Sequence, residues 1–240
     1  MGQVHRTSAK ALAGERVSYA EQMDFIRQNC NSQALYQYLS DHQDEFQCVI
    51  FGPYLFGLTY WSVQTIPDKA LLLPCLHDEP LAYFTIYREL LEQVRGVIFN
   101  APAERQFAID KLGMVNRSTA VVGFGFHPIT EQPDAQGFRE RFKLPKELLF
   151  YSGRIEGGKN VPLLLDYFAR YKAERPGPVT LALSGGDGVL PTQDGVVGLG
   201  FLDEADLRAA YAAARVLVQP SVNESFSIVI MESWQHGRPV

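Results

Sequence analysis

Short apolar runs alternate with segments of helical periodicity over most of this 240-residue chain, and this alternation restricts the folds open to it. The apolar runs, each four or five residues long, are 48–51, 70–73, 96–99, 119–122, 148–151, 179–183, 196–199 and 216–219. Runs of this length that end in glycine, proline or polar residues are typical of buried strands. Strands that alternate with helices through short connections pair in parallel. The sequence therefore predicts an α/β protein with parallel sheets.

The segments between these strands carry the spacing of amphipathic helices. Helices are expected at 84–94, 103–112, 162–171 and 204–214, and a further helical segment is expected at 19–39 with a break at 29–32. Residues 1–18 show no apolar period, so we expect them to form a flexible lead-in.

A polar segment rich in proline and glycine divides the alternating pattern. Residues 128–145 contain Pro128, Pro133, Gly137 and Pro145, and strands alternate with helices again after it. We therefore expect a linker at 128–145 between two Rossmann-like domains, one at 1–127 and one at 146–240.

Composition and charge exclude several function classes. Hydrophobic residues make up 46% of the chain and the net charge is −5, so the chain has a normal globular core and lacks the basic surface that nucleic acids require. The three cysteines, Cys30, Cys48 and Cys75, are far apart, which favours reduced thiols in the cytoplasm over a disulfide framework or a zinc site. Neither a signal peptide nor a membrane-spanning apolar stretch is recognisable, and peripheral membrane contact stays open.

The last 18 residues, 223–240, carry two carboxylates on a strand–loop–helix unit. Glu224 follows the strand at 216–219, and an apolar helix start follows Glu224, with Ser225 or Ser227 as the expected N-cap. A helix N-terminus presents free N–H groups that suit a phosphate, and carboxylates accept hydrogen bonds from hydroxyl groups. The alternative is that Glu224 caps a turn and Glu232 is a solvated helix charge.

A second polar segment, 152–160, also lies between a predicted strand and a helix. Gly153 permits close approach of a ligand to the backbone, and Arg154 and Lys159 are cations that suit diphosphate oxygens. The alternative is a surface loop with two solvated cations. The glycines of 184–188 have the wrong spacing for a dinucleotide fingerprint, which disfavours a nicotinamide-dependent oxidoreductase.

The segment from Glu224 to Glu232 resembles the Glu-x(7)-Glu signature of family-four retaining glycosyltransferases, which have the GT-B fold. Ser225, Ser227 and Ser233 replace the glycines and alanine that are common in that signature. The resemblance implies two Rossmann-like domains whose parallel sheets face a cleft, both incomplete because the chain is truncated at both ends.

The resemblance also implies roles for individual residues. Glu224 and His77 become the catalytic candidates, with Glu224 near the anomeric carbon and His77 facing the donor sugar from the acceptor side. The implied donor-binding residues are Gly153, Arg154, Lys159, Gly185, Phe226, Ser227, Ile228 and Glu232. Among these, Arg154 and Lys159 clamp the diphosphate and Glu232 accepts from the ribose hydroxyls.

The implied activity is that of a nucleotide-sugar-dependent, hexosyltransferase-like enzyme that needs no metal or other cofactor. Its donor is a UDP- or GDP-linked sugar and its acceptor a glycan, a lipid-linked molecule or a small molecule. The alternative is a non-catalytic GT-B fragment that acts as a partner subunit or scaffold. A partner chain or a second copy is expected to cover the truncated sheet edges.

Overall fold

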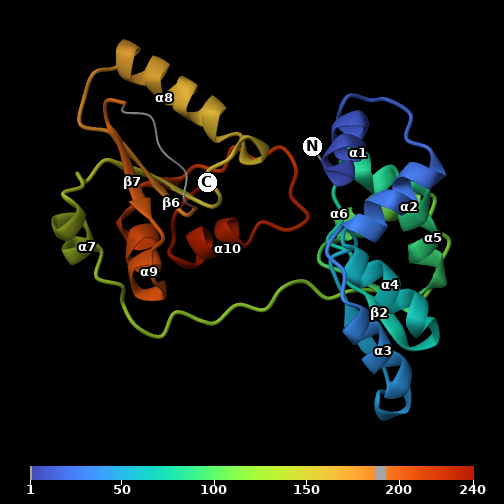
Figure 1. Cartoon of the computed structure of the whole chain (residues 1–240). Coiled ribbons are helices and arrows are strands. Elements are labelled where there is room, and N and C mark those ends of the chain that lie inside the picture. The colour runs from blue at the N-terminus through green and yellow to red at the C-terminus, as the bar shows by residue number, and fades with distance from the viewer. Residues whose placement is uncertain (1, 187–192) are drawn as a thin grey trace. The chain divides into compact units, whose positions relative to one another are not determined.

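The computed structural model describes residues 2–186 and 193–240, which form two compact units that divide between Phe124 and Gly125 (Figure 1). Each unit contains a four-stranded sheet in which every pairing is parallel. The predicted α/β class with parallel sheets is therefore confirmed.

The first unit has the strand order β1-β2-β3-β4. Its strands are β1 (Val49–Phe51), β2 (Ala70–Leu72), β3 (Gly96–Phe99) and β4 (Thr119–Val121). Its helices are α1 (Gln3–Leu12), α2 (Tyr19–Gln28), α3 (Gln33–Asp41), α4 (Gly57–Thr65), α5 (Thr85–Gln93) and α6 (Pro102–Asp110), with 3₁₀ turns at Gln43–Glu45, Pro67–Lys69 and Pro80–Tyr83. All four strands predicted in this half of the chain are present, each within one residue of its expected limits.

Residues 1–18 are not the flexible lead-in that we expected, because helix α1 occupies most of them. Thr7 and Ala11 are buried, and Val4 is partly buried against the core of the first unit. These side chains recur every three or four residues, so they line one face of a helix. The face was missed because its apolar side chains are small or β-branched, and the polar residues opposite them carry most of the periodic pattern.

The break predicted between α2 and α3 is confirmed. Ser18 caps α2 through a reciprocal capping box with Glu21, and Ser32 caps α3 by accepting from Leu35 N. Phe25 and Ile26 of α2 join the apolar core. Each helix therefore starts at a serine whose side chain satisfies an N–H group that the helix leaves free.

The second unit has the strand order β7-β6-β5-β8. Its strands are β5 (Leu148–Ser152), β6 (Thr180–Ser184), β7 (Val196–Gly200) and β8 (Val216–Leu217). Its helices are α7 (Ala135–Phe142), α8 (Val161–Glu174), α9 (Glu204–Ala213) and α10 (Ile228–Gln235), with a 3₁₀ turn at Gly157–Lys159. The four strands predicted here are present, although β8 ends two residues earlier than expected.

Helices cover both faces of the second sheet, with α8 on one side of β6 and β7 and with α9 and α10 on the other (Figure 1). Consecutive residues of β5 serve opposite faces: Phe150 packs in the cluster that includes α9, and Tyr151 packs in the cluster that includes α8. This alternation follows from the two-residue period of a strand. Because helices cover both faces, residues on both sides of such a strand are buried, and the strands appear in the sequence as continuous apolar runs.

Residues 128–145, which we expected to be a linker, include helix α7. Asp134 caps this helix through Gly137 N, and Phe138 is only 1% exposed in the core of the second unit. Helix α7 has only one large buried residue, Phe138, in about two turns, so its sequence gave no recognisable helical period. The apolar side chain of Phe138 nevertheless anchors the segment to α9.

The C-terminal stretch adopts the strand–loop–helix arrangement that its sequence predicts. Ser227 is the N-cap residue of α10, and Gly237 follows the helix with a φ of +66°. Leu217 N of β8 donates to Pro239 O at 2.9 Å, so the chain after α10 runs beside β8.

Candidate functional site

The strand order of the second unit reverses at β5, and this reversal locates the candidate site. The chain proceeds outward from β5 through β6 to β7 and then returns to place β8 on the other side of β5. In open parallel sheets, ligands bind outside the carboxyl ends of the two strands at such a switch point. The segments that follow β5 and β8 are the two polar segments singled out in the sequence.

A pocket of about 160 Å³ lies between these two segments. The residues from the β5 side are Tyr151, Ser152, Gly153 and Lys159, and those from the β8 side are Gln219, Glu224, Phe226, Ser227, Ile228 and Val229. Six of the sequence-predicted site residues thus line one cavity: Gly153, Lys159, Glu224, Phe226, Ser227 and Ile228.

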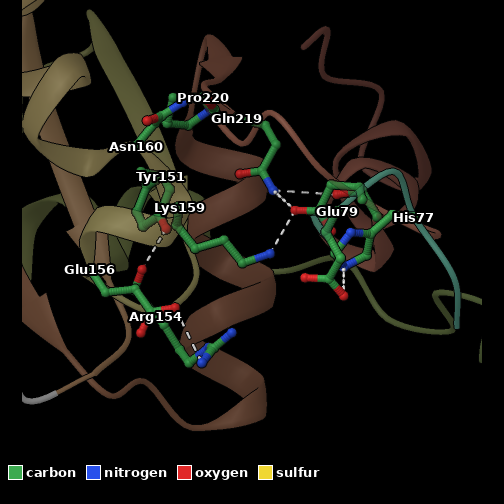
Figure 2. Close-up of polar contacts among 11 residues, drawn as sticks. His77, Glu79, Tyr151, Arg154, Glu156, Lys159, Asn160, Gln219 and Pro220 are labelled. Atoms are coloured by element: carbon green, nitrogen blue, oxygen red, sulfur yellow. Dashed lines mark hydrogen bonds and ion pairs between the residues drawn. The ribbon is translucent and has the colours of Figure 1, made fainter. Parts of the chain in front are cut away.

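An ion pair joins the two walls of this pocket. Lys159 Nζ lies 2.7 Å from Glu224 Oε1, and the two side chains are 23% and 26% exposed. The amide of Gln219 donates to the same carboxylate oxygen at 2.9 Å and to Ser227 Oγ at 3.4 Å (Figure 2). A half-buried cation and a carboxylate with two donors therefore converge where α10 begins.

Two hydrogen bonds hold the segment after β5 in place. Gly153 has a φ of +150°, and its N–H donates to Ser184 O at 3.0 Å. The phenol of Tyr151 donates to Arg154 O at 2.7 Å. Burial, and then the negative charges of Glu156 and Glu224, raise the pKa of Tyr151 to about 12. The phenol therefore stays protonated as a donor at neutral pH.

A further contact ties the two segments to each other. Asn160, in the left-handed conformation with φ +54°, donates from Nδ2 to Pro220 O at 3.1 Å (Figure 2). On the β8 side, the ring of Phe226 stacks on that of Phe126 with centroids 6.2 Å apart. Both walls of the pocket are thus fixed by contacts within the second unit.

Arg154 and Gly185 lie beside the pocket and do not line it. The Arg154 side chain is 73% exposed and pairs with Glu156 at 3.2 Å. Gly185 has a φ of +108°, and a Cβ placed on it would lie 2.5 Å from Gly153 O. Only glycine fits at position 185, because any side chain would collide with the backbone under the pocket. The rest of that predicted glycine turn, from Asp187, lies outside the described residues.

Glu232 lies one helical turn beyond the start of α10 and is held by Tyr211 of α9. The Tyr211 phenol donates to Glu232 Oε2 at 2.7 Å, and its ring stacks on His236 with centroids 5.5 Å apart. His236 Nδ1 in turn lies 2.7 Å from Glu232 O. Burial raises the pKa of Tyr211, and the bond to Glu232 raises it further, so the phenol keeps the proton that it donates.

His77 belongs to the first unit, five residues after β2. Its Nε2 lies 3.6 Å from Glu79 Oε1, and Tyr54 donates to the same oxygen at 2.5 Å. Burial and the Glu79 carboxylate raise the pKa of Tyr54, so Tyr54 stays a donor. Among the described residues His77 Nδ1 has no hydrogen-bond partner. The ring is thus adjacent to a carboxylate that Tyr54 holds in place.

Within the described part of the chain, no cluster of three or more His, Cys, Asp or Glu residues could hold a metal ion. The three cysteines are unpaired, with Cys30 and Cys48 exposed and Cys75 partly exposed. None of the helices in the ranges 2–186 and 193–240 is long and apolar enough to cross a membrane.

Sequence reasoning missed Gln219, Tyr151, Ser152 and Tyr211. The first three stand at strand ends that were interpreted only as apolar runs. Their position at the carboxyl ends of β5 and β8 could have identified them, once the sheet was expected to be doubly wound. Nothing in the sequence indicated a role for Tyr211 at the site, because an aromatic residue in an alanine-rich helix is expected to pack in the core.

The fold and the comparisons with known proteins define a class. The two parallel α/β units have the GT-B fold of glycosyltransferases. Residues 146–240 match the family model described as "Glycosyl transferases group 1". The matched domain and the GT-B structural neighbours support a glycosyltransferase of the family-four type.

One relative is the D-inositol 3-phosphate glycosyltransferase of Streptosporangium roseum, which is 30% identical over 183 residues. The match covers 68% of this chain and 42% of the relative, so the chain spans well under half of that enzyme's length.

Two solved structures show the shared fold over most of the chain. The sucrose-phosphate synthase of Thermosynechococcus elongatus has a TM-score of 0.71 and 18% identity over 94% of this chain and 62% of its own. Anabaena HepE, in complex with UDP and glucose, has a TM-score of 0.70 and 20% identity over 85% of this chain and 61% of its own. HepE has also been solved with UDP-glucose.

Proposed function

We propose that this chain transfers a sugar from a nucleoside diphosphate sugar, UDP- or GDP-linked, to a glycan, lipid-linked or small-molecule acceptor. The transfer retains the anomeric configuration and requires no metal ion. The observation that carries the proposal is the pairing of Lys159 with Glu224 in a pocket at the switch point of a parallel sheet. The cation suits the diphosphate of such a donor, and the carboxylate suits the hydroxyl groups of its sugar.

Lys159 and the start of α10 bind the diphosphate of the donor. Lys159 neutralises the diphosphate as it leaves, and the first N–H groups of α10, around Phe226, Ser227 and Ile228, stabilise its remaining charge. Arg154 supplies a second cation: its exposed guanidinium exchanges the surface pairing with Glu156 for a phosphate oxygen. This exchange costs little, because an exposed ion pair contributes little stability.

The two carboxylates bind the transferred sugar and the ribose of the donor. Glu224 accepts hydrogen bonds from hydroxyls of the transferred sugar near the anomeric carbon. Glu232, oriented by Tyr211, accepts from the ribose hydroxyls. Gly153 lets the backbone after β5 approach the nucleotide closely, and Gly185 lets its own backbone pack against Gly153 beneath the site.

His77 acts from the first unit on the acceptor side of the sugar. The Glu79 carboxylate near Nε2, held by Tyr54, restrains the ring. Neutral imidazole both donates and accepts hydrogen bonds, so His77 suits a hydroxyl group of the sugar.

Isothermal titration of the chain with UDP and with GDP, with and without EDTA, tests the donor site. One of the two nucleotides is expected to bind, with a Kd that EDTA leaves unchanged. Proton NMR of the transfer product then reports the anomeric configuration. Binding of neither nucleotide contradicts the proposal. Nucleotide binding without transfer, together with a specific protein complex, favours the alternative of a non-catalytic partner subunit.

A substitution in the first unit separates catalysis from nucleotide binding. His77→Ala is expected to abolish most transfer while the Kd of the nucleotide stays within about twofold, because the nucleotide contacts come from the second unit. His5→Ala, at an exposed position of α1, is the matched control and should leave both quantities unchanged. A parallel loss of nucleotide affinity in His77→Ala contradicts the assigned role.

A further inference from the structure

Gln219 donates hydrogen bonds to both Glu224 and Ser227 at the pocket, and nothing in the sequence motifs assigns it a role. It follows β8 closely and lines the cavity. Its Nε2 lies 2.9 Å from Glu224 Oε1 and 3.4 Å from Ser227 Oγ.

The orientation of the Gln219 amide follows from the chemistry of its neighbour. An ionised carboxylate only accepts hydrogen bonds, so the NH₂ group must face Glu224. The carbonyl oxygen is then directed away from both contacts, as Figure 2 shows. This oxygen is buried and has no hydrogen-bond partner among the described residues. Because a buried acceptor without a donor costs free energy, the position favours a ligand that donates to it.

The same chemistry decides which part of a nucleotide sugar meets this oxygen. Phosphate oxygens only accept at neutral pH, so an amide oxygen repels them, whereas sugar hydroxyls donate. Lys159 is the cation that lines this pocket, and Glu224 and Gln219 contribute acceptor oxygens from residues that line the same cavity. We propose that Gln219 is a sugar-recognition residue: its amide nitrogen orients Glu224 and its amide oxygen accepts a hydrogen bond from a hydroxyl of the transferred sugar. This inference rests on the proposed function.

Two substitutions divide the two halves of the amide. Gln219→Leu removes the donor and the acceptor while keeping a side chain of similar size. Gln219→Glu keeps an acceptor oxygen but replaces the donor by a second carboxylate next to Glu224. Gln136→Leu is the matched control, because Gln136 likewise donates to a carboxylate, that of Glu140 at 2.8 Å, on the exposed face of α7.

The experiment is isothermal titration of the full chain and each variant with UDP, UDP-glucose, GDP and GDP-mannose, after circular dichroism has shown that the variant is folded. Gln219→Leu is expected to bind the sugar nucleotide about 5- to 20-fold more weakly, the loss typical of one hydrogen bond at a buried site, whereas Gln219→Glu, which keeps an acceptor oxygen, should lose less of the sugar-dependent part of the affinity. In Gln219→Leu the affinity for the matching nucleoside diphosphate should change by less than about twofold, since it lacks the sugar hydroxyls.

Each other outcome overturns the inference. Equal losses for nucleotide and sugar nucleotide would show that Gln219 only supports the Lys159–Glu224 pair. Unchanged binding of both would show that its amide oxygen meets no ligand. Absence of binding of all four compounds to the unmodified chain would overturn the proposed function and this inference together, whereas the first two outcomes leave the proposed function standing.

Discussion

Lys159 and Glu224 are 65 residues apart in the sequence and meet at 2.7 Å across the pocket of the second unit. Lys159 comes from the turn after β5, and Glu224 from the loop between β8 and α10. In a partly buried pair, each charge stabilises the other before any ligand arrives. Bound diphosphate must therefore compete with Glu224 for Lys159, unless the lysine bridges both.

This arrangement predicts a charge-specific loss in Lys159→Ala. The variant is expected to bind the nucleoside diphosphate about 10- to 100-fold more weakly, because it removes a charge-assisted hydrogen bond to phosphate. Isothermal titration measures the loss. Lys146→Ala removes the same charge from a position of the same unit outside the pocket lining and should change the Kd by less than about twofold. Equal effects of the two variants would mean that only the net charge matters.

The contact between Tyr211 and Glu232 predicts a loss that is confined to ribose recognition. Tyr211→Phe leaves the ring in place but removes the hydrogen bond that orients the carboxylate. We expect nucleotide affinity to fall by about 3- to 10-fold, the usual range for one hydrogen bond. The preference for UDP over 2′-deoxy-UDP, or for GDP over its 2′-deoxy form, should shrink as well.

Titration with the ribo- and deoxynucleotides checks this prediction. Tyr167→Phe, at a position of α8 that is 59% exposed, removes a phenol elsewhere in the unit and serves as the control. A Tyr211→Phe variant that loses affinity equally for both nucleotides would place Tyr211 in the support of the fold and not in ribose recognition.

Gly185→Ala is expected to destabilise the second unit by roughly 2 kcal/mol or more, given the usual cost of a non-glycine residue in such a conformation. The new Cβ would lie 2.5 Å from Gly153 O, at a φ of +108°. Gly157→Ala is the control, because no atom lies within 4 Å of the point that a methyl group would occupy there and Gly157 is not among the positive-φ glycines.

Urea unfolding followed by the fluorescence of Trp234, in a Trp61→Phe background, reports on the second unit alone. The control should differ from the unmodified unit by no more than about 0.5 kcal/mol. Similar unfolding curves for Gly185→Ala and Gly157→Ala would mean that the two backbone segments separate at little cost.

Glu104 predicts a pH dependence for the first unit. It is 4% exposed and accepts from Leu76 N at 2.6 Å and Asn100 N at 2.7 Å. Burial raises its pKa above the ordinary value of 4.5 in spite of these bonds. A carboxyl group whose folded pKa is raised contributes stability that is fully present below the unfolded pKa and is lost as pH rises through the folded pKa.

The free energy of unfolding of the first unit should therefore decrease as pH rises from 4.5 toward neutrality, through the contribution of this group. Urea unfolding followed by Trp61 fluorescence, in a Trp234→Phe background, measures it. Glu104→Gln should lose this part of the slope, and Glu45→Gln, at an exposed position, should keep it. An unchanged slope in Glu104→Gln would show that the hydrogen bonds to its carboxylate cancel the effect of burial on its pKa.

Strands were predictable wherever burial on both faces gave a continuous apolar run, as in 148–151 and 179–183. Helices were predictable where large apolar side chains recur, as in α5 and α8. Helices α1 and α7 escaped prediction because each relies on a few small side chains or on one large one, such as Ala11 or Phe138. For such segments, tertiary packing stabilises a helix that a search for recurring large apolar residues does not reveal.

Local spacing along the chain was enough to predict the α/β alternation and the kinds of side chain at the candidate site, with Lys159 and Glu224 visible as residues that follow strands. The folded chain decided which of these residues share a cavity: it brought Lys159, Glu224 and Gln219 together and left the exposed Arg154 outside the pocket lining. The difference lies in the strand order. Only the return of β8 to the side of β5 opposite β6 sets the two polar loops next to each other, and strand order depends on long-range pairing that no local pattern encodes.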